Sequence, residues 1–412
     1  MGTSAQDSTQ IPYAKQANQT QFFYGKEEEK RIGMLLQSVA KKVLVLYGRE
    51  ELRNTSWYEQ MLDSLQTVQI SFVEFGGIDG NTELAQIEEG ISVCHRQQVD
   101  YILAVGGGSV IDAAKAIAMG AVCDHCVWNY FTTEQKPTAA LPVALVLTIP
   151  GSGSENNDQT MITNEATLLK MSCRSQVLQP QFCIISPEIF YTIEQPQLAH
   201  AVVSMLTRLL CDYLLLLHQD ADVKRIKKME QKIKTLLHKA RVLQLNRFDD
   251  NAWLELVLLD AYQSNQDQDG RQEDACLHMA AELSAMYDVP YGAVLAVLLP
   301  AWVQFVCSKN PQAYCSFAQN IMGVDVALEP QDQLQEGIRQ LEGFLAEMGL
   351  SNSLCALGIE DFCFKNVAQI CTGYGWGQEQ PFGVIQPLYW QDLYQIYQSV
   401  YEHTISEEVC SA

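Results

Sequence analysis

Short apolar runs and helical patterns alternate along the first half of the chain. Residues 42–47 (KVLVLY) form a nearly continuous apolar run that predicts a buried strand, and residues 56–67 then show the spacing of a helix. The same alternation predicts strands at residues 68–75, 101–105, 142–147 and 182–185, and helices at residues 84–98 and 110–119. Strands that alternate with helices are typical of βαβ units, so we expect a parallel sheet.

The pattern changes at about residue 195, where strand signals almost vanish. Long helical patterns then follow one another at residues 197–217, 223–243, 253–262, 273–286, 293–306 and 331–348. The sequence therefore predicts an α/β domain at residues 1–194 and an all-helical domain at residues 195–412.

The chain is acidic, with a formal net charge of −22. This charge repels nucleic acid and anionic lipid, so we expect neither as a partner. No apolar run approaches the roughly 20 residues that span a bilayer, and the polar N-terminal segment lacks the apolar part of a secretory signal, which favours a cytoplasmic protein. Residues 223–242 are basic and carry apolar residues at helical spacing, so we interpret them as an amphipathic helix with a solvated basic face.

Thirteen cysteines are scattered without the spacing of a disulfide framework, so most are expected to be reduced thiols packed as small apolar groups. One local pair, Cys123 and Cys126, has CxxC spacing. Such a pair can hold half of a zinc site or form a redox disulfide, but the matching second pair is missing. The pattern leaves open whether this pair is redox-active, binds metal or does neither.

A glycine-rich turn, Gly106-Gly107-Gly108-Ser109, directly follows the strand predicted at residues 101–105 and opens the next helix. Glycines between a strand and a helix let the backbone approach a ligand closely, and the helix N-terminus offers free N–H groups to a phosphate. A tight turn alone also requires glycine. The turn therefore predicts a phosphate-binding site, with the geometry of the turn itself as the alternative explanation.

The longer strings resemble the iron-containing alcohol dehydrogenase family, of the butanol dehydrogenase type. They are VGGGSVIDAAKAIA at residues 105–118, LTIPGSGSEN at 147–156 and ELSAMYDVPYGAVLAVLLPAW at 282–302. The resemblance implies a dehydroquinate synthase-like architecture, with an α/β dinucleotide-binding domain and an all-helical domain that carries one divalent metal. It implies aldehyde reduction or alcohol oxidation with NAD(P). The implied cofactor-binding residues are Gly48, Gly106, Gly107, Gly108, Ser109, Asp112, Thr148, Ser152 and Lys170.

The sequence departs from the family at the metal site, whose ligands are one aspartate and three histidines. Ser204 stands at the aspartate position, and the histidine positions hold Arg208, Leu277 and Tyr291. All four are non-ligands, so we predict that no metal is bound. Losing a Lewis acid that stabilises an alkoxide costs at least about four orders of magnitude in rate. The neighbouring His278 is out of register for a relocated site and lacks an obvious partner apart from Glu282.

Arg208 and Tyr291 have two interpretations. They could perform metal-free chemistry, with the guanidinium polarising a carbonyl and the phenol donating a proton. Alternatively, Arg208 could form an ion pair, with Glu282 or Asp212, that seals an unused site.

Cofactor preference depends on the turn after the first predicted strand, which reads Gly48-Arg-Glu-Glu51. Carboxylates there disfavour the 2′-phosphate of NADP but can bond a ribose hydroxyl, so NAD(H) is expected over NADP. Asp158 adds a negative charge near the second string.

Three hypotheses follow from these departures. The first is a degenerate dehydrogenase homologue that is inactive or strongly weakened and acts as a binding protein or partner subunit. The second is a metal-free enzyme that uses Arg208 and Tyr291 with NAD(H). The third is a conventional metal-dependent, NAD(P)-dependent alcohol dehydrogenase. In each case we expect a nucleotide or other small-molecule ligand, and a homodimer or a pairing with a paralogue.

Overall fold

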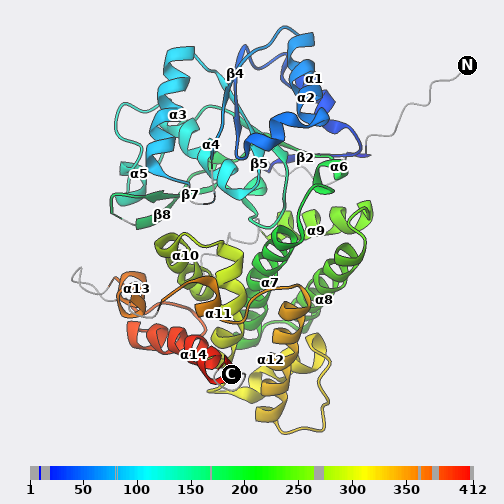
Figure 1. The fold of residues 1–412 in the computed structure, drawn as a ribbon, viewed down its shortest axis with the longest axis vertical. Coiled ribbons are helices and arrows are strands. Elements are labelled where there is room, and N and C mark those ends of the chain that lie inside the picture. Colours follow the sequence, from blue (N-terminus) through cyan, green and yellow to red (C-terminus); the bar gives the residue numbers. More distant parts are fainter. Residues whose placement is uncertain are drawn as a thin grey trace, which may run out of the picture. The chain divides into compact units, whose positions relative to one another are not determined.

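The computed structural model describes residues 9–10, 19–78, 80, 82–167, 169–263, 273–360, 363–373 and 380–408. Its contacts divide the chain into two compact units (Figure 1). The first unit comprises Met1–Ile193 and Asn246–Asn265, and the second comprises Glu194–Leu245 and Gln266–Ala412.

The first unit is built around a seven-stranded sheet with the order β1-β2-β9-β6-β5-β3-β4. Its strands are β1 (Thr9–Gln10), β2 (Gln21–Tyr24), β3 (Lys42–Tyr47), β4 (Ser71–Phe75), β5 (Tyr101–Gly106), β6 (Val143–Leu147) and β9 (Phe182–Ile185). All neighbouring pairs are parallel except β1 with β2. This pairing confirms the predicted parallel sheet. Its physical basis is that strands of continuous apolar residues, such as β3 and β5, can be buried on both faces.

Helices cover both faces of this sheet (Figure 1). A core cluster joins α1 (Ile32–Leu36) and α2 (Ser56–Thr67) to one face, while α4 (Gly108–Gly120) packs on β5 and α3 (Leu84–Gln97) packs on α4. Shorter helices of this unit are η1 (Glu28–Arg31), η2 (Glu50–Asn54), α5 (Asn129–Thr132), η3 (Ser154–Asn156), η4 (Gln176–Leu178) and α6 (Pro187–Phe190). An antiparallel hairpin of β7 (Gln159–Asn164) and β8 (Leu169–Arg174), which the apolar pattern did not predict, forms a second sheet.

One helix, α9 (Asp250–Gln263), belongs to the first unit although the expected division at residues 194 and 195 assigned it to the helical domain. Trp253 of α9 packs on the ring of Phe190 with centroids 5.1 Å apart. The hydroxyl of Tyr24 donates to the backbone carbonyl of Asp250 at 2.9 Å. These contacts lie between segments that are far apart in the sequence, so a helical period alone could not assign α9 to a unit.

The regular elements among the described residues of the second unit are helices, apart from an isolated β-bridge between Phe382 and Leu388. Its longer helices are α7 (Gln195–His218), α8 (Val223–Leu245), α10 (Ala275–Tyr287), α11 (Tyr291–Cys307), α12 (Pro330–Glu347), α13 (Phe364–Cys371) and α14 (Trp390–Glu408). Shorter turns are η6 (Pro311–Tyr314), the π-helical η7 (Phe317–Ile321) and η8 (Cys355–Leu357). The α/β domain followed by an all-helical domain is therefore confirmed as the fold class.

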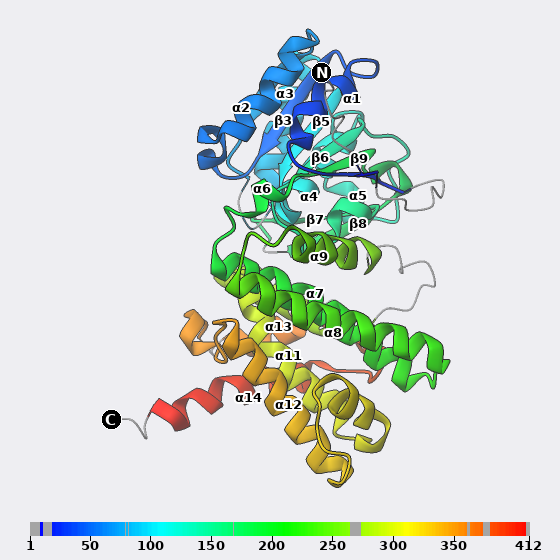
Figure 2. The ribbon, with the colours of Figure 1, turned by 90° about the vertical axis from the view of Figure 1, so that its right-hand side faces the viewer.

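Helices α7 and α8 lie side by side (Figure 2). The predicted amphipathic character of α8 is confirmed, because Met229, Ile233 and Leu236 are buried while most of its basic residues are exposed. The expectation that no apolar run is long enough to span a membrane was wrong for α7. An 18-residue window of α7 has a mean hydropathy of 1.5, but 72% of that window is buried in the fold, as in the core helix of a soluble protein.

Candidate functional site

The glycine turn lies where the strand order of the sheet reverses. The chain passes from β3 to β4 on one side and then returns to place β5 on the other side of β3. Gly48 directly follows β3, and Gly106 ends the neighbouring β5, so both glycines lie at the carboxyl ends of adjacent parallel strands. In open α/β sheets, ligands bind outside the carboxyl ends of the strands at such a switch point.

Close packing of the turn on the chain after β6 explains two of its glycines. A Cβ atom at Gly107 would lie 2.5 Å from Ile149 Cγ2, and one at Gly108 would lie 2.6 Å from Ser152 Cβ. The backbone N–H of Thr148 donates to the carbonyl of Gly106 at 3.1 Å. The predicted cofactor-binding residues Thr148 and Ser152 are thus brought against the turn.

The beginning of α4 fits a pyrophosphate. Because α4 starts at Gly108, its first backbone N–H groups have no carbonyl partner within the helix and can donate to an anion. The Ser109 hydroxyl donates to the carbonyl of Gly80 at 3.0 Å. The hydroxyl of Thr82 in turn donates to the carbonyl of Ser109 at 3.1 Å, so the loop before α3 is fastened to the turn.

Asp112 is half-buried, and its carboxyl group forms a hydrogen bond with Ser154 in the chain between β6 and β7. Burial raises the pKa of its carboxyl to about 6, while the charge of Lys115, a hydrogen bond with Ser154 and the charge of Lys170 act in the opposite direction. Lys170 on β8 therefore lies close enough to Asp112 to interact with it electrostatically, and two of the predicted cofactor residues share one site. The local sequence is compatible with either a ligand contact or a contact within the protein for Asp112. The contact within the protein was therefore not predicted.

Lys115 was not predicted as a site residue, although it belongs to the string at residues 105–118. It is fully buried, and burial lowers its pKa to about 8 against the charges of Asp112 and Glu155, which raise it. Its ammonium group donates to oxygen atoms of the loop before β7, the nearest of which is the carbonyl of Ser154 at 2.7 Å. The only indication in the sequence is that apolar residues surround Lys115. A lysine within a buried helical stretch needs several hydrogen-bond acceptors.

The turn after β3 holds its charged residues in pairs. The hydroxyl of Tyr47 donates to Glu50 at 3.0 Å, and the Arg53 guanidinium lies 3.4 Å from the same carboxylate and 3.1 Å from Glu74. Two carboxylates surround one guanidinium here, so the local charge disfavours a further phosphate. The charge of Asp158, expected to act on the nearby loop, is paired with Arg174 at 3.3 Å.

The four positions that correspond to the family's metal ligands lie on three helices that pack together in the second unit. Ser204 and Arg208 are on α7, Leu277 is on α10 and Tyr291 is the first residue of α11. The Tyr291 hydroxyl donates to the backbone carbonyl of Leu277 at 3.3 Å. Burial raises the pKa of Tyr291, with a further contribution from Cys276, while the charge of Arg208 lowers it in part.

These side chains do not fit a metal ion. Leu277 has no donor atom, Arg208 carries a fixed positive charge, and Tyr291 holds its proton at neutral pH. Ser204 and Tyr291 offer only neutral hydroxyl oxygens, which are weak metal ligands. Among the described residues, which include Cys123 and Cys126, no group of three His, Cys, Asp or Glu side chains is arranged to hold a metal ion.

His278 has a partner other than the one considered from the sequence. Its Nε2 lies 3.2 Å from Asp274, and its ring packs edge to face on Phe382. Burial lowers the pKa of His278, but the hydrogen bond and charge of Asp274, together with the charge of Glu282, outweigh burial and raise it. The histidine therefore has a local partner at the beginning of α10.

Comparison with known proteins decides the family. Residues 19–187 match the family described as "Iron-containing alcohol dehydrogenase", and residues 270–401 match the family description "Fe-containing alcohol dehydrogenase family, C-terminal". The chain belongs to the iron-containing alcohol dehydrogenase family.

Similar dehydrogenases cover nearly the whole of this family member. The probable NADH-dependent butanol dehydrogenase 1 of Bacillus subtilis is 29% identical over 92% of this chain and 97% of its own length. The NADH-dependent butanol dehydrogenase A of Clostridium acetobutylicum is 25% identical over 93% of this chain and 98% of its own. The crystal structure of NADH-dependent butanol dehydrogenase A from Thermotoga maritima superimposes with a TM-score of 0.85 at 28% identity, covering 95% of this chain and 99% of that one.

Proposed function

We propose that this chain is a degenerate iron-type alcohol dehydrogenase homologue that binds no catalytic metal and is inactive or strongly weakened as an alcohol or aldehyde dehydrogenase. The observation that carries the proposal is the set of side chains at the four ligand positions. A hydrophobic residue, a fixed cation, a protonated phenol and a neutral hydroxyl cannot replace one carboxylate and three imidazoles.

We also propose that the first unit still binds NAD(H). The turn at the switch point and the free N–H groups at the start of α4 support this, as do the relatives whose names specify NADH. When bound, the nicotinamide ring supplies the hydride that the family's reaction transfers. The carboxylates of Glu50 and Glu74 around Arg53 favour NADH over NADPH, because a 2′-phosphate would meet a net negative charge.

Metal-free catalysis by Arg208 and Tyr291 is less well supported. A general acid works best when its pKa lies near the operating pH, and the pKa of Tyr291 is instead raised above its ordinary value of about 10. Its hydroxyl also donates to the Leu277 carbonyl. Conventional metal-dependent dehydrogenase activity remains the alternative that the names of the relatives favour.

The first test combines metal analysis with cofactor titration of the purified protein. We expect no stoichiometric iron or zinc after purification without chelator, and micromolar binding of NADH that is tighter than binding of NADPH. Stoichiometric metal together with reduction of butanal would support the conventional dehydrogenase. Failure to bind either nucleotide would refute the NAD(H) proposal but not the loss of the metal.

The second test restores the family's ligands. The variant Ser204→Asp, Arg208→His, Leu277→His, Tyr291→His should bind one divalent metal, and it should gain aldehyde reduction if the substituted ligands alone account for the loss. The matched control keeps Leu277 and carries only the other three substitutions. Equal activity of the parent, the control and the restored variant would contradict the proposal.

We further propose that the protein forms a homodimer or pairs with an active paralogue, since the family resemblance implies a dimer. Light scattering of the purified chain, alone and mixed with such a paralogue, measures the mass that decides this.

A further inference from the structure

The 149–159 loop, which follows β6 and includes the first residue of β7, is contacted by two buried charges of opposite sign from two different helices. Lys115 reaches it from α4, and Asp260 reaches it from α9. Both side chains are fully buried, and both form hydrogen bonds to the loop backbone. All of these residues lie within the first unit.

Lys115 binds the carbonyl side of the loop. Its ammonium group donates to the carbonyls of Ser154, Asn157 and Gln159 at 2.7, 2.8 and 2.9 Å, and to the Asn157 side-chain oxygen at 2.8 Å. Three N–H bonds thus serve four oxygen atoms drawn from six successive residues. An uncharged side chain of similar length could not satisfy these acceptors.

Asp260 binds the N–H side of the same loop. One carboxylate oxygen accepts from the backbone N–H of Gly151 and, at 3.3 Å, from that of Gly153. Gly151 and Gly153 have φ angles of 126° and 72°, a region that favours glycine. Successive N–H groups in such a turn point to one side and form a concave anion site, which here receives the protein's own carboxylate.

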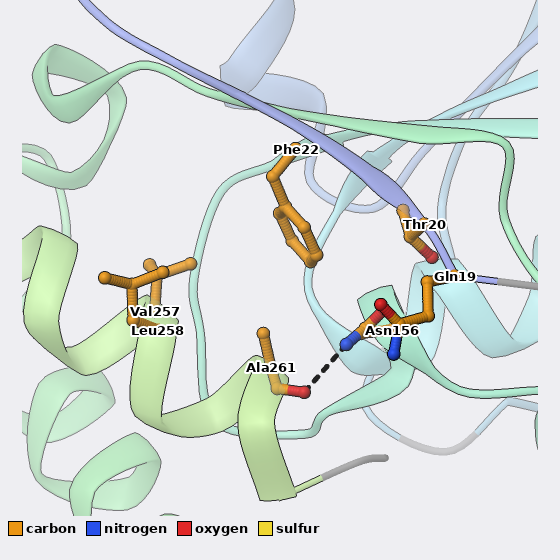
Figure 3. Close-up of a pocket in the computed structure, with 7 residues that line it drawn as sticks. All are labelled: Gln19, Thr20, Phe22, Asn156, Val257, Leu258 and Ala261. Carbon is orange, nitrogen blue, oxygen red and sulfur yellow. Dashed lines mark hydrogen bonds between the residues drawn. The ribbon is translucent and has the colours of Figure 1, made fainter. Parts of the chain in front are cut away.

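A third bond joins the loop to α9 beside a small pocket (Figure 3). The side-chain amide of Asn156 donates to the carbonyl of Ala261 at 2.7 Å. Asp260 and Ala261 are adjacent, so one end of α9 meets the loop at both Gly151 and Asn156. The apolar lining from Phe22 and Val257 shields this junction on one side.

The held loop covers the glycine turn. Ile149 and Ser152 lie so close to Gly107 and Gly108 that a methyl group at either glycine would overlap with them. The path of the loop therefore sets how the turn can present its N–H groups. A displacement of the loop by even 1–2 Å would change the space above the start of α4, where the pyrophosphate is proposed to bind.

We propose that Lys115 and Asp260 are positioning residues, which together hold the 149–159 loop over the glycine turn in the shape that nucleotide binding requires. The inference rests on the proposed NAD(H) binding for its functional part. Its structural part, the restraint of the loop by the two charges, does not depend on any ligand.

The test measures amide hydrogen exchange of the 149–159 loop in the free protein, followed by NADH titration. The variants are Lys115→Met and Asp260→Leu, which remove the charges at similar volume. Asp249→Asn is the matched control, since Asp249 accepts from Ala252 at the beginning of α9, away from the loop. We expect at least about tenfold faster exchange in the loop for the first two variants, since each loses charge-assisted bonds. The dissociation constant for NADH should rise at least about tenfold, with little change in the control.

Asp260→Asn keeps the proposal testable if either of these variants does not fold. Both bonds go to the same carboxylate oxygen, so an amide oxygen can replace it as a neutral acceptor. Exchange at Gly151 and Gly153 should then accelerate by about fivefold, because a neutral acceptor is weaker by about 1 kcal/mol. Loop exchange in a folded Asp260→Leu or Asp260→Asn protein that equals the control would overturn the proposal.

Nucleotide binding separates the two proposals. If the parent protein does not bind NADH, the proposed NAD(H) binding fails, while the exchange measurement still decides whether the two charges restrain the loop. If the parent binds NADH and the loop variants bind it equally well despite faster exchange, the positioning role is wrong and the proposed function stands.

Discussion

Gly107→Ala tests whether the glycine turn persists for packing or for ligand approach. The new Cβ atom would lie 2.5 Å from Ile149 Cγ2, whereas carbon atoms in van der Waals contact are about 3.5–4.0 Å apart. The turn or the loop must therefore move by about 1 Å. Overpacking of this kind typically costs about 1–3 kcal/mol.

Ile149→Ala removes the methyl group that the new Cβ atom would strike. Alone, it should cost about 1–2 kcal/mol, at or below the low end for isoleucine truncation, because Ile149 is only half-buried. In the double variant the overlap is absent. Its loss of stability should therefore be smaller than the sum of the two single-variant losses by about 1–3 kcal/mol. Urea unfolding of the parent, the two single variants and the double variant gives this coupling energy.

NADH titration of the same four proteins then distinguishes the two reasons for glycine. The Cβ atom at Gly107 points toward Ile149, so Gly107→Ala should weaken binding at least about tenfold through the displaced loop, and the double variant should recover to within about threefold of Ile149→Ala. A double variant that is as stable as Ile149→Ala but does not bind NADH would refute this reasoning. It would mean that the ligand itself needs the space at Gly107.

Three further predictions concern single side chains. Tyr291→Phe should lower the free energy of unfolding by about 1 kcal/mol or less, because it loses one 3.3 Å bond, and a larger loss in chemical denaturation would contradict the assigned role. The pKa of Asp112 is raised from 3.8 to about 6, so the folded state binds more protons in that window and stability falls as pH rises through it. Asp112→Asn should remove a decline of about 2 kcal/mol between pH 4 and 6 in urea titrations, and an unchanged slope would show that the shift is absent. Glu50→Gln should improve NADPH affinity by about fivefold and NADH affinity by less than twofold, since it frees Arg53 from one carboxylate, and an unchanged ratio of the two affinities would argue against the charge explanation.

Local patterns predicted most of the elements, because each is determined by residues near one another in the sequence. The strand at residues 42–47 and the helix at residues 56–67 have the predicted bounds, and the glycine turn lies between a strand and a helix as expected. The hairpin of β7 and β8 was missed because its residues are mixed polar and apolar, and its register depends on partners across the turn.

Contacts between distant segments could not be predicted in the same way. Nothing near Asp260 in the sequence indicates that its carboxylate meets Gly151, which is more than a hundred residues away, or that α9 therefore belongs to the first unit. The motif around Lys115 predicts a ligand site in general, but it does not indicate which of its residues turn inward. The side chains at the ligand positions, by contrast, could be identified from the sequence through the family resemblance. That step requires only the residue type at each matching position and no knowledge of contacts in the fold.

The glycine turn and the substituted ligand positions belong to different units of the chain. Thr148 bonds to the glycine turn, while Lys115 and Asp260 bond to the 149–159 segment that packs on it. All of these bonds lie within the first unit, so substitutions on α7, α10 and α11 do not remove them. In the second unit, the Tyr291 hydroxyl donates to the Leu277 carbonyl, so this phenol has a protein partner at the substituted positions. A chain of this kind can lose Lewis-acid catalysis and still fold with its nucleotide turn preorganised. The ligand-restoring variant should therefore need no change in the first unit, and a requirement for compensating substitutions near the 149–159 loop would show that the two units have diverged together.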